Sequence, residues 1–232
     1  MNAIGIIGAM DAEVNGLIKK LDGHKIDVVG GIEFHTGRLL RREVVIARCG
    51  VGKVFAAMCA EAMIIRYAPS LIVNTGVAGG LDSSLSCGDI VVAEKLCQHD
   101  MDTSALGDEK GLISGINKIY FESDEAAVDA VMLSAYELGI TVKRGVIATG
   151  DKFIADGTDR ERIISEFGAS ACEMEGGAIA HTAFVNNTPF VVIRAISDGA
   201  NSDSKVDFPT FLAVAAKKSE AITLALVEKY QK

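Results

Sequence analysis

The sequence has little proline and no excess of positive charge. Only 3 of its 232 residues are proline while 49% are hydrophobic, a balance that is typical of folded chains and argues against disorder. The formal net charge of −8 repels phosphate groups, so we expect no nucleic acid and no anionic membrane surface among its partners. The sequence also lacks an apolar run of the ~18–20 residues needed to cross a bilayer.

The cysteines and histidines lack the spacings of metal sites and disulfide frameworks. The 5 cysteines are odd in number, so they cannot pair completely within one chain, and they form no CxxC motif. We therefore expect no metal, and we interpret the cysteines as small buried apolar residues. The first residues also lack the basic region of a secretion signal, which together with the cysteines favours the cytoplasm.

Strand-like apolar runs alternate with helix-like segments along the chain. Ala3–Ala9, Leu71–Thr75 and Phe190–Ile196 are predicted to be buried strands, and Lys53–Tyr67 a long helix that ends before Pro69. This alternation predicts an α/β fold, a three-layer α/β/α sandwich with a largely parallel central sheet, and we interpret residues 1–232 as a single domain. The other expected strands are Lys25–Val29, Ile32–Leu39, Glu43–Arg48, Asp89–Ala93, Thr141–Thr149 and one ending at Met174; the other expected helices are Ala12–Leu21, one from Ser123 or Asp124 to Gly139, Thr158–Phe167, one ending near Asn187 and one from about Pro209.

Three segments interrupt this simple alternation. The short strands between residues 25 and 48 are joined by Gly30-Gly31 and Arg41-Arg42, which predicts an antiparallel meander and therefore a mixed sheet. Residues 97–120 form a long irregular polar segment, and loops of this length in compact domains are usually functional. In the last helix, we expect a buried stripe, which consists of Phe211, Ala215, Ile222 and Leu226.

Three carboxylates follow buried strands, and we expect them to meet at one site. Glu13, Glu175 and Asp198 each lie at the carboxyl end of an apolar run, where ligands bind in open α/β sheets. Each also has a structural explanation by itself: the helix dipole for Glu13, a helix start for Glu175 and an Asx turn for Asp198. The functional interpretation, a site that handles protons and hydroxyl groups, depends on their convergence.

Other residues near the same strand ends have two possible interpretations. Arg194 lies inside an apolar strand and needs an acidic partner, for which Glu13, Glu173 and Glu175 are candidates; a structural pair with Glu173 would be sufficient. The segment 76–80 is rich in glycine but lacks the ending of a P-loop, so it is either a tight turn or backbone that approaches a ligand.

Two aromatic side chains are placed to stack on a planar ligand or to fill the core. Phe153, followed by Ile154, comes after a strand end, and Phe208 is expected in the loop before the last helix. Core filling is the more common role for such residues.

Several motifs occur in order from the first strand to the last helix, namely Ile4-Gly5-Ile6-Ile7-Gly8-Ala9-Met10 with Glu13, Asn74-Thr75-Gly76 with Ala78-Gly79-Gly80, Gly88-Asp89-Ile90-Val91-Val92, Gly150-Asp151 with Phe153-Ile154, Glu173-Met174-Glu175 and Arg194-Ala195-Ile196-Ser197-Asp198. Together they resemble the bacterial 5′-methylthioadenosine/S-adenosylhomocysteine nucleosidases of the nucleoside phosphorylase superfamily. The resemblance implies a nucleoside phosphorylase-like fold, a homodimer without metal or cofactor, and irreversible hydrolysis of the N-glycosidic bond to adenine.

The resemblance also implies roles for single residues. Asp198 would be the general acid at adenine N7, Glu13 would activate water, and Glu175 would hold the ribose hydroxyls. Arg194 would help to hold Glu13 or the water. Leu106, in the segment 97–120, would reach the site of the partner subunit. The other substrate-binding residues that it implies are Met10, Val51, Val77, Gly79, Phe153, Ile154, Met174, Ser197 and Phe208.

One position departs from the family pattern. Many relatives have serine where this chain has Val77, and valine cannot donate a hydrogen bond to water or sugar. Either Glu13 and Arg194 position the water without it, or the rate or substrate preference of this chain differs.

Three other functions remain open on the sequence. A nucleoside phosphorylase of the same fold would need cationic side chains for phosphate, and Arg48 alone is a weak phosphate site. The sequence does not distinguish a hydrolase of aminodeoxyfutalosine, which is also an adenine nucleoside, and one enzyme can act on both kinds of substrate. A non-catalytic adenine-nucleoside binding protein is disfavoured because all three acids are present.

Overall fold

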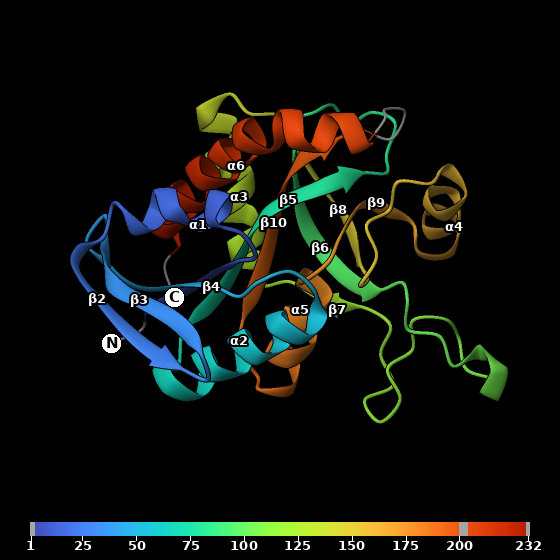
Figure 1. The fold of residues 1–232 in the computed structure, drawn as a ribbon, viewed down its shortest axis with the longest axis horizontal. Coiled ribbons are helices and arrows are strands. Elements are labelled where there is room, and N and C mark those ends of the chain that lie inside the picture. Colours follow the sequence, from blue (N-terminus) through green and yellow to red (C-terminus); the bar gives the residue numbers. More distant parts are fainter. Residues whose placement is uncertain (1–2, 200–203, 231–232) are drawn as a thin grey trace.

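The computed structural model describes residues 3–199 and 204–230, in which strands and helices alternate as expected (Figure 1). The strands are β1 (Ile4–Gly8), β2 (Asp22–Val29), β3 (Ile32–Leu39), β4 (Arg42–Arg48), β5 (Leu71–Gly80), β6 (Ile90–Gln98), β7 (Phe121–Glu122), β8 (Val142–Thr149), β9 (Ala169–Glu173) and β10 (Phe190–Asp198). The helices are α1 (Asp11–Ile18), α2 (Lys53–Tyr67), α3 (Glu125–Leu138), α4 (Gly157–Phe167), α5 (Gly176–Val185) and α6 (Ser204–Lys229), with a short 3-10 helix, η1 (Ser104–Leu106).

All of these strands belong to one mixed sheet with the order β10-β6-β8-β9-β5-β1-β4-β3-β2, and β7 pairs with β6. The expected meander is confirmed as the antiparallel run β2-β3-β4. The strands β1, β4, β5 and β10 run parallel to one another, so their carboxyl ends lie at the same side of the sheet.

Part of the sheet closes on itself, which the sequence did not indicate. β5 pairs with β10 along most of its length and also with β9 through Gly79 and Gly80. Because β10, β6, β8 and β9 are already neighbours in the sheet, this second pairing completes a ring of five strands. The pairing of β5 with β9 is antiparallel and short, and it places the end of β9 beside the middle of β5.

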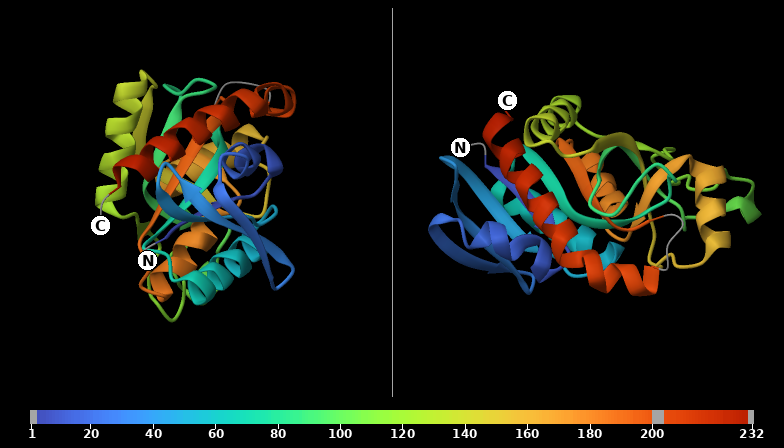
Figure 2. Two further views of the ribbon diagram at one scale, coloured as in Figure 1. Left: turned by 90° about the vertical axis from the view of Figure 1, so that its left-hand side faces the viewer. Right: turned by 90° about the horizontal axis from the view of Figure 1, so that it is seen from above.

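The helices cover both faces of the sheet, so the predicted three layers are confirmed. Leu17 of α1, Val128 of α3 and Leu226 of α6 share one buried cluster with one sheet face. On the other face, Met63 of α2 and Ile179 of α5 belong to a second cluster. Figure 2 shows α3 and α6 side by side on the first face, and in Figure 1 α2 and α5 lie together on the opposite side. Within the described residues no helix is both long and apolar enough to cross a membrane.

Capping residues explain why α3 and α4 begin and end close to where the sequence predicted. The side chains of Asp124 and Asp156 accept hydrogen bonds from backbone N–H groups in the first turns of α3 and α4. Both helices end at glycines, Gly139 and Gly168, that adopt positive φ angles of 63° and 61°. This geometry is strained for a residue with a Cβ atom, so these glycines fix the helix ends.

Of the two alternatives for the glycine-rich segment 76–80, the tight turn is excluded, because this segment is the second half of β5, where it pairs with β10 and β9. Two expectations about the last helix were wrong. Phe208 lies in a helix rather than in a loop, because α6 begins at Ser204 and continues past Pro209. Of the expected stripe on α6, Ala215, Ile222 and Leu226 are buried, but Phe211 is 36% exposed.

Candidate active site

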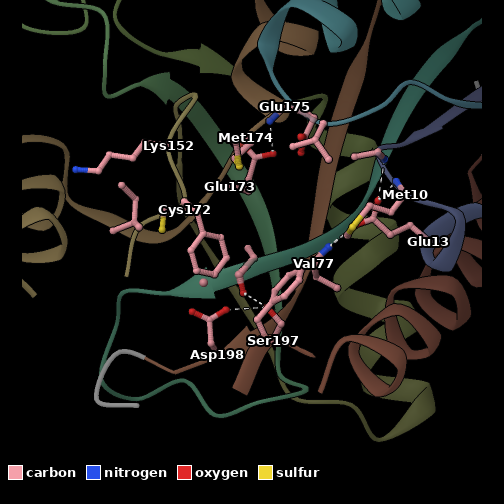
Figure 3. Close-up of a pocket in the computed structure, with 17 residues that line it drawn as sticks. Met10, Glu13, Val77, Lys152, Cys172, Glu173, Met174, Glu175, Ser197 and Asp198 are labelled. Carbon is pink, nitrogen blue, oxygen red and sulfur yellow. Dashed lines mark hydrogen bonds between the residues drawn. The ribbon is translucent and has the colours of Figure 1, made fainter. Parts of the chain in front are cut away.

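A pocket of about 260 Å³ lies where β1, β5, β9 and β10 come together (Figure 3). Its walls are mainly apolar with a few convergent polar groups, which is typical of sites for small organic ligands. Two of the predicted site residues, Arg194 and Leu106, do not line it. The predicted residues that do are Met10, Glu13, Val51, Val77, Gly79, Phe153, Ile154, Met174, Glu175, Ser197, Asp198 and Phe208.

Glu13 is held in the pocket by backbone N–H groups of two strand ends. Its Oε2 atom accepts hydrogen bonds from Ala9 N at 2.7 Å and Met10 N at 2.9 Å, and its Oε1 atom accepts one from Val77 N at 3.1 Å. A Cβ atom on Gly76 would lie 2.5 Å from Oε1, so a side chain at that position would displace the Glu13 carboxylate. Burial raises the pKa of Glu13, although the positive charge of Arg194 and these N–H groups act against the shift. A fixed carboxylate with a raised pKa is suited to accept a proton.

Arg194 is 1% exposed and is paired with Glu173, as the simplest interpretation of the sequence predicted. Its Nη2 atom lies 2.5 Å from Glu173 Oε2 and donates to Asn74 Oδ1. It is 4.0 Å from Glu175 Oε2 and makes no ion pair with Glu13 within that distance. The backbone provides the hydrogen bonds of Glu13, and Arg194 acts on Glu13 through its positive charge. The expectation that Arg194 helps to hold Glu13 or the water stays a prediction.

Glu173, the partner of Arg194, also holds the turn that carries Glu175. Its Oε2 atom also accepts hydrogen bonds from Glu175 N at 3.0 Å and Gly176 N at 2.7 Å, and its Oε1 atom accepts one from the Thr149 hydroxyl. These bonds fix the start of α5 and aim Glu175 into the pocket, where its Oε1 atom accepts a hydrogen bond from Gly52 N at 2.8 Å.

The electrostatic surroundings of Glu175 favour its protonated form. Burial, together with the negative charge of Glu173, raises its pKa to about 7. The positive charge of Arg194 and the hydrogen bond from Gly52 limit this shift. Near neutral pH the Glu175 carboxyl can therefore either donate or accept a hydrogen bond.

Asp198 is buried at the end of β10, where the strand is irregular. The register between β10 and β5 shifts between Ile196 and Asp198, and such bulges re-aim side chains at the edges of functional sites. The Ser197 hydroxyl donates to Asp198 Oδ1 at 2.8 Å. A Cβ atom on Gly79 would lie 3.2 Å from Asp198 Oδ2, so glycine in β5 leaves room for this carboxyl group.

Strand register explains why the acids occupy opposite ends of the pocket. Gly79 pairs with Asp198 on one side and with Cys172 on the other. Because β9 runs antiparallel to β5, its chain leads from Gly79 back along β5 as far as Glu173, and Glu175 follows at the start of α5. Figure 3 shows Asp198 and Ser197 at one end of the pocket and Glu13 and Glu175 away from them.

Apolar side chains complete the walls between the two ends. Phe153 and Phe208 meet edge to face with ring centroids 5.6 Å apart, so both predicted aromatics belong to the pocket. Leu106 is 84% exposed in η1 and does not line the pocket of its own subunit.

Sequence reasoning missed several residues at the site. Arg160, in α4, lies with its Nη2 atom 3.5 Å from Asp198 Oδ2. Arg160 lies 38 residues before Asp198 in the sequence, so no local pattern indicated this contact. The missed pocket residues are Ala9, Ala78, Lys152, Cys172 and Glu173. Among the residues that the structure describes, no group of three or more His, Cys, Asp or Glu side chains is arranged to hold a metal ion.

Comparison with known proteins identifies the family. A model of the phosphorylase superfamily matches residues 3–228. A protein from Shewanella sediminis named 5′-methylthioadenosine/S-adenosylhomocysteine nucleosidase is 41% identical over 97% of this chain and 99% of its own length. A protein of the same name from Shewanella loihica is 40% identical over 97% of this chain and 98% of its own length. The chain belongs to this nucleosidase family.

Solved structures give the same result for the fold. The nucleosidase of this family from Neisseria meningitidis, in complex with methylthio-immucillin-A, has a TM-score of 0.95 and 33% identity, and the match covers 99% of this chain and 100% of that one. The futalosine hydrolase of Helicobacter pylori has a TM-score of 0.94 and 33% identity, over 99% of this chain and 98% of that one. The nucleoside phosphorylase-like α/β fold is therefore confirmed.

The buried ion pair gives a first prediction. Replacing Arg194 by methionine leaves Glu173 charged and unpaired, so we expect the free energy of unfolding to fall by about 3–5 kcal/mol in urea titrations. The double variant Arg194→Met/Glu173→Met should lose less than the two single variants together, because neither charge is buried alone. Arg144→Met, which breaks an exposed pair with Glu125, is the matched control and should cost at most about 1 kcal/mol. Equal losses for Arg194→Met and Arg144→Met would contradict the role of the buried pair.

The raised pKa of Glu175 gives a second prediction. Since this pKa is about 7 in the folded protein against an ordinary 4.5, the folded state holds this proton more tightly between the two values. Its contribution to stability is complete below pH 4.5 and is lost as the pH rises through 7. We expect the unfolding free energy of the unmodified protein to fall, relative to Glu175→Gln, by up to about 3 kcal/mol between pH 4.5 and 8.

Urea titrations of both proteins across this range measure the difference. Glu161→Gln, at an exposed position of α4, is the matched control. A Glu175→Gln variant whose stability follows the same pH curve as the unmodified protein would show that this carboxyl does not titrate in the expected range.

Proposed function

We propose that this protein hydrolyses the N-glycosidic bond of adenine thionucleosides, 5′-methylthioadenosine and S-adenosylhomocysteine among them, and releases adenine. Its membership of the nucleosidase family supports the reaction. The proposal rests on the placement of three acids in one pocket, with Asp198 at one end and Glu13 and Glu175 at the other. A purine riboside matches this placement: its base, which accepts a proton, suits the end with Asp198, and its sugar, which bears hydroxyl groups and the reacting carbon, suits the other end.

At the base end, Asp198 acts as the general acid. As the bond between C1′ and N9 breaks, its electron pair passes to the purine, and the proton of the Asp198 carboxyl passes to N7, so adenine leaves neutral. Ser197 keeps the carboxyl in place by its hydrogen bond to Oδ1. Phe153 stacks on the purine, and the backbone of Ile154 and Gly79 contacts its edge. An adenine presents an N7 acceptor beside an N6 donor, which matches a carboxyl group that both donates and accepts.

At the sugar end, two carboxyl groups face the ring that becomes positively charged. Glycosidic cleavage passes through an oxocarbenium-like state, which nearby negative charge stabilises. Glu175 binds the ribose hydroxyls, and Glu13 accepts a proton from the water that attacks C1′. Val77 contributes its N–H group to Glu13 but no hydroxyl, so water positioning falls to Glu13. The apolar side chains of Met10, Val51, Met174 and Phe208 suit the alkylthio group of the substrate.

The scarcity of cations favours water over phosphate as the nucleophile. Lys152 is the one cationic side chain among the described residues that line the pocket, and it pairs with Asp159. Arg48 pairs with Asp11 and does not line the pocket. Aminodeoxyfutalosine is a second candidate substrate, because the Helicobacter pylori futalosine hydrolase has a nearly superimposable fold.

Release of free adenine tests the proposal. In phosphate-free buffer we expect the purified protein to release adenine from 5′-methylthioadenosine, S-adenosylhomocysteine and 5′-deoxyadenosine, measured by chromatography, with a rate that added phosphate does not change. Aminodeoxyfutalosine in the same assay tests the second substrate. Asp198→Asn should lower kcat by at least ~10²-fold, because the acid is lost, while its melting temperature stays close to that of the unmodified protein.

Asp129→Asn, an exposed change on α3, is the matched control and should retain full activity. Strict dependence on phosphate would identify a phosphorylase instead. Tight binding of the nucleosides without any adenine release would identify a binding protein.

We further propose that the protein is a homodimer whose interface includes α2. Val54 is 70% exposed and Met58 is 49% exposed on this helix, and Phe55 between them is also exposed. Clustered exposed apolar side chains mark interaction surfaces. The cluster continues to the exposed Val51 at the pocket. The green segment that carries η1 projects away from the sheet in Figure 1, and Leu106 within it is 84% exposed, so it can reach the pocket of a partner.

Sedimentation tests this arrangement. We expect a mass of twice 24.4 kDa for the unmodified protein and a monomer for Val54→Glu/Met58→Glu, because buried unpaired carboxylates oppose association. Tyr136→Glu, on α3 at the opposite face of the sheet, is the control and should leave the mass unchanged. A monomeric unmodified protein would contradict the proposal.

A further inference from the structure

A buried arginine from outside the recognised motifs lies beside Asp198. Arg160 is 7% exposed, and its Nη2 atom is 3.5 Å from Asp198 Oδ2. Its Nη1 atom donates to the backbone oxygen of Gly199 at 2.9 Å. One guanidinium group therefore contacts both the carboxyl of Asp198 and the peptide group that follows it.

The other described neighbours of Asp198 are neutral, so Arg160 is the cation that faces it. From β10, Ser197 offers a neutral hydroxyl, and from β5 the facing residue is Gly79. From β9, Cys172 lies close by, and burial together with the charge of Asp198 raises the pKa of this thiol to about 12, so it stays neutral. Within the described residues, Arg160 is the cationic group within 4 Å of Asp198.

We propose that Arg160 is a positioning residue for the general acid, which holds Asp198 toward the base and stabilises the carboxylate that remains after proton transfer. The inference rests on the proposed function. When the glycosidic electron pair moves to the purine and N7 takes the proton, a negative charge stays on Asp198 in a buried site. An adjacent guanidinium lowers the energy of that charge and so favours the proton transfer.

The alternative is a purely structural role, in which Arg160 only fixes the chain through Gly199. The two roles depend on different properties of the side chain. Support of the carboxylate needs the positive charge, whereas the bond to Gly199 needs only an N–H donor. Glutamine at position 160 keeps an N–H donor without the charge, and lysine keeps the charge without the planar guanidinium group.

The test compares Arg160→Gln and Arg160→Lys with the unmodified protein in kcat and KM for adenine release from 5′-methylthioadenosine. For Arg160→Gln we expect kcat to fall about tenfold or more while KM stays close to its original value, because the cation no longer stabilises the carboxylate that remains after proton transfer. Arg160→Lys should retain most of kcat. Arg162→Gln, two residues along α4 and paired with Glu166 near the surface, is the matched control and should change neither kcat nor KM.

Two outcomes overturn the proposal. An unchanged kcat in Arg160→Gln would exclude any role in proton transfer, and equal losses of kcat in Arg160→Gln and Arg160→Lys, with equal falls in melting temperature, would identify the structural role. If Arg160→Gln does not fold, Arg160→Lys decides: a retained kcat supports the role of charge, and a kcat reduced about tenfold or more overturns it. An unmodified protein that releases no adenine would instead refute the proposed function itself.

Discussion

The pairing of Arg194 with Glu173 is the interaction on which the site depends. A guanidinium group in the middle of a buried strand is costly to remove from water, so it requires a carboxylate of matching geometry. Glu173 meets that need and at the same time accepts the first backbone N–H groups of α5. The ion pair thereby joins β10 to the turn after β9, and the position of Glu175 follows from it.

A second constraint is the electrostatic balance among carboxyl groups in one small pocket. Glu13, Glu173 and Glu175 repel one another, and the shared positive charge of Arg194 offsets part of this repulsion. Asp198 pairs with Gly79 near the end of β5 and has Arg160 beside it. A cation therefore lies near each end of the pocket, Arg194 beside Glu173 and Glu175, and Arg160 beside Asp198.

The sequence predicted those features that local patterns determine. Apolar runs, capping aspartates and terminal glycines placed most strands and helices within a few residues, and the acids after the strands marked one site. The ring closed by Gly79 and Gly80 depends on contact between distant segments, which no local pattern records. The same reason applies to Arg160. The start of α6 was misplaced because proline usually marks a first helical turn, whereas Pro209 lies farther inside.

A crystal structure with an unreactive adenine nucleoside analogue would test the central claim most directly, namely that one riboside spans both ends of the pocket. We expect the purine to lie beside Phe153 with N7 within hydrogen-bonding distance of the Asp198 carboxyl. We expect the ribose hydroxyls on Glu175 and a water between Glu13 and C1′. A ligand bound in the reverse orientation, with its sugar at Asp198, or bound outside this pocket would contradict the assignment of the three acids.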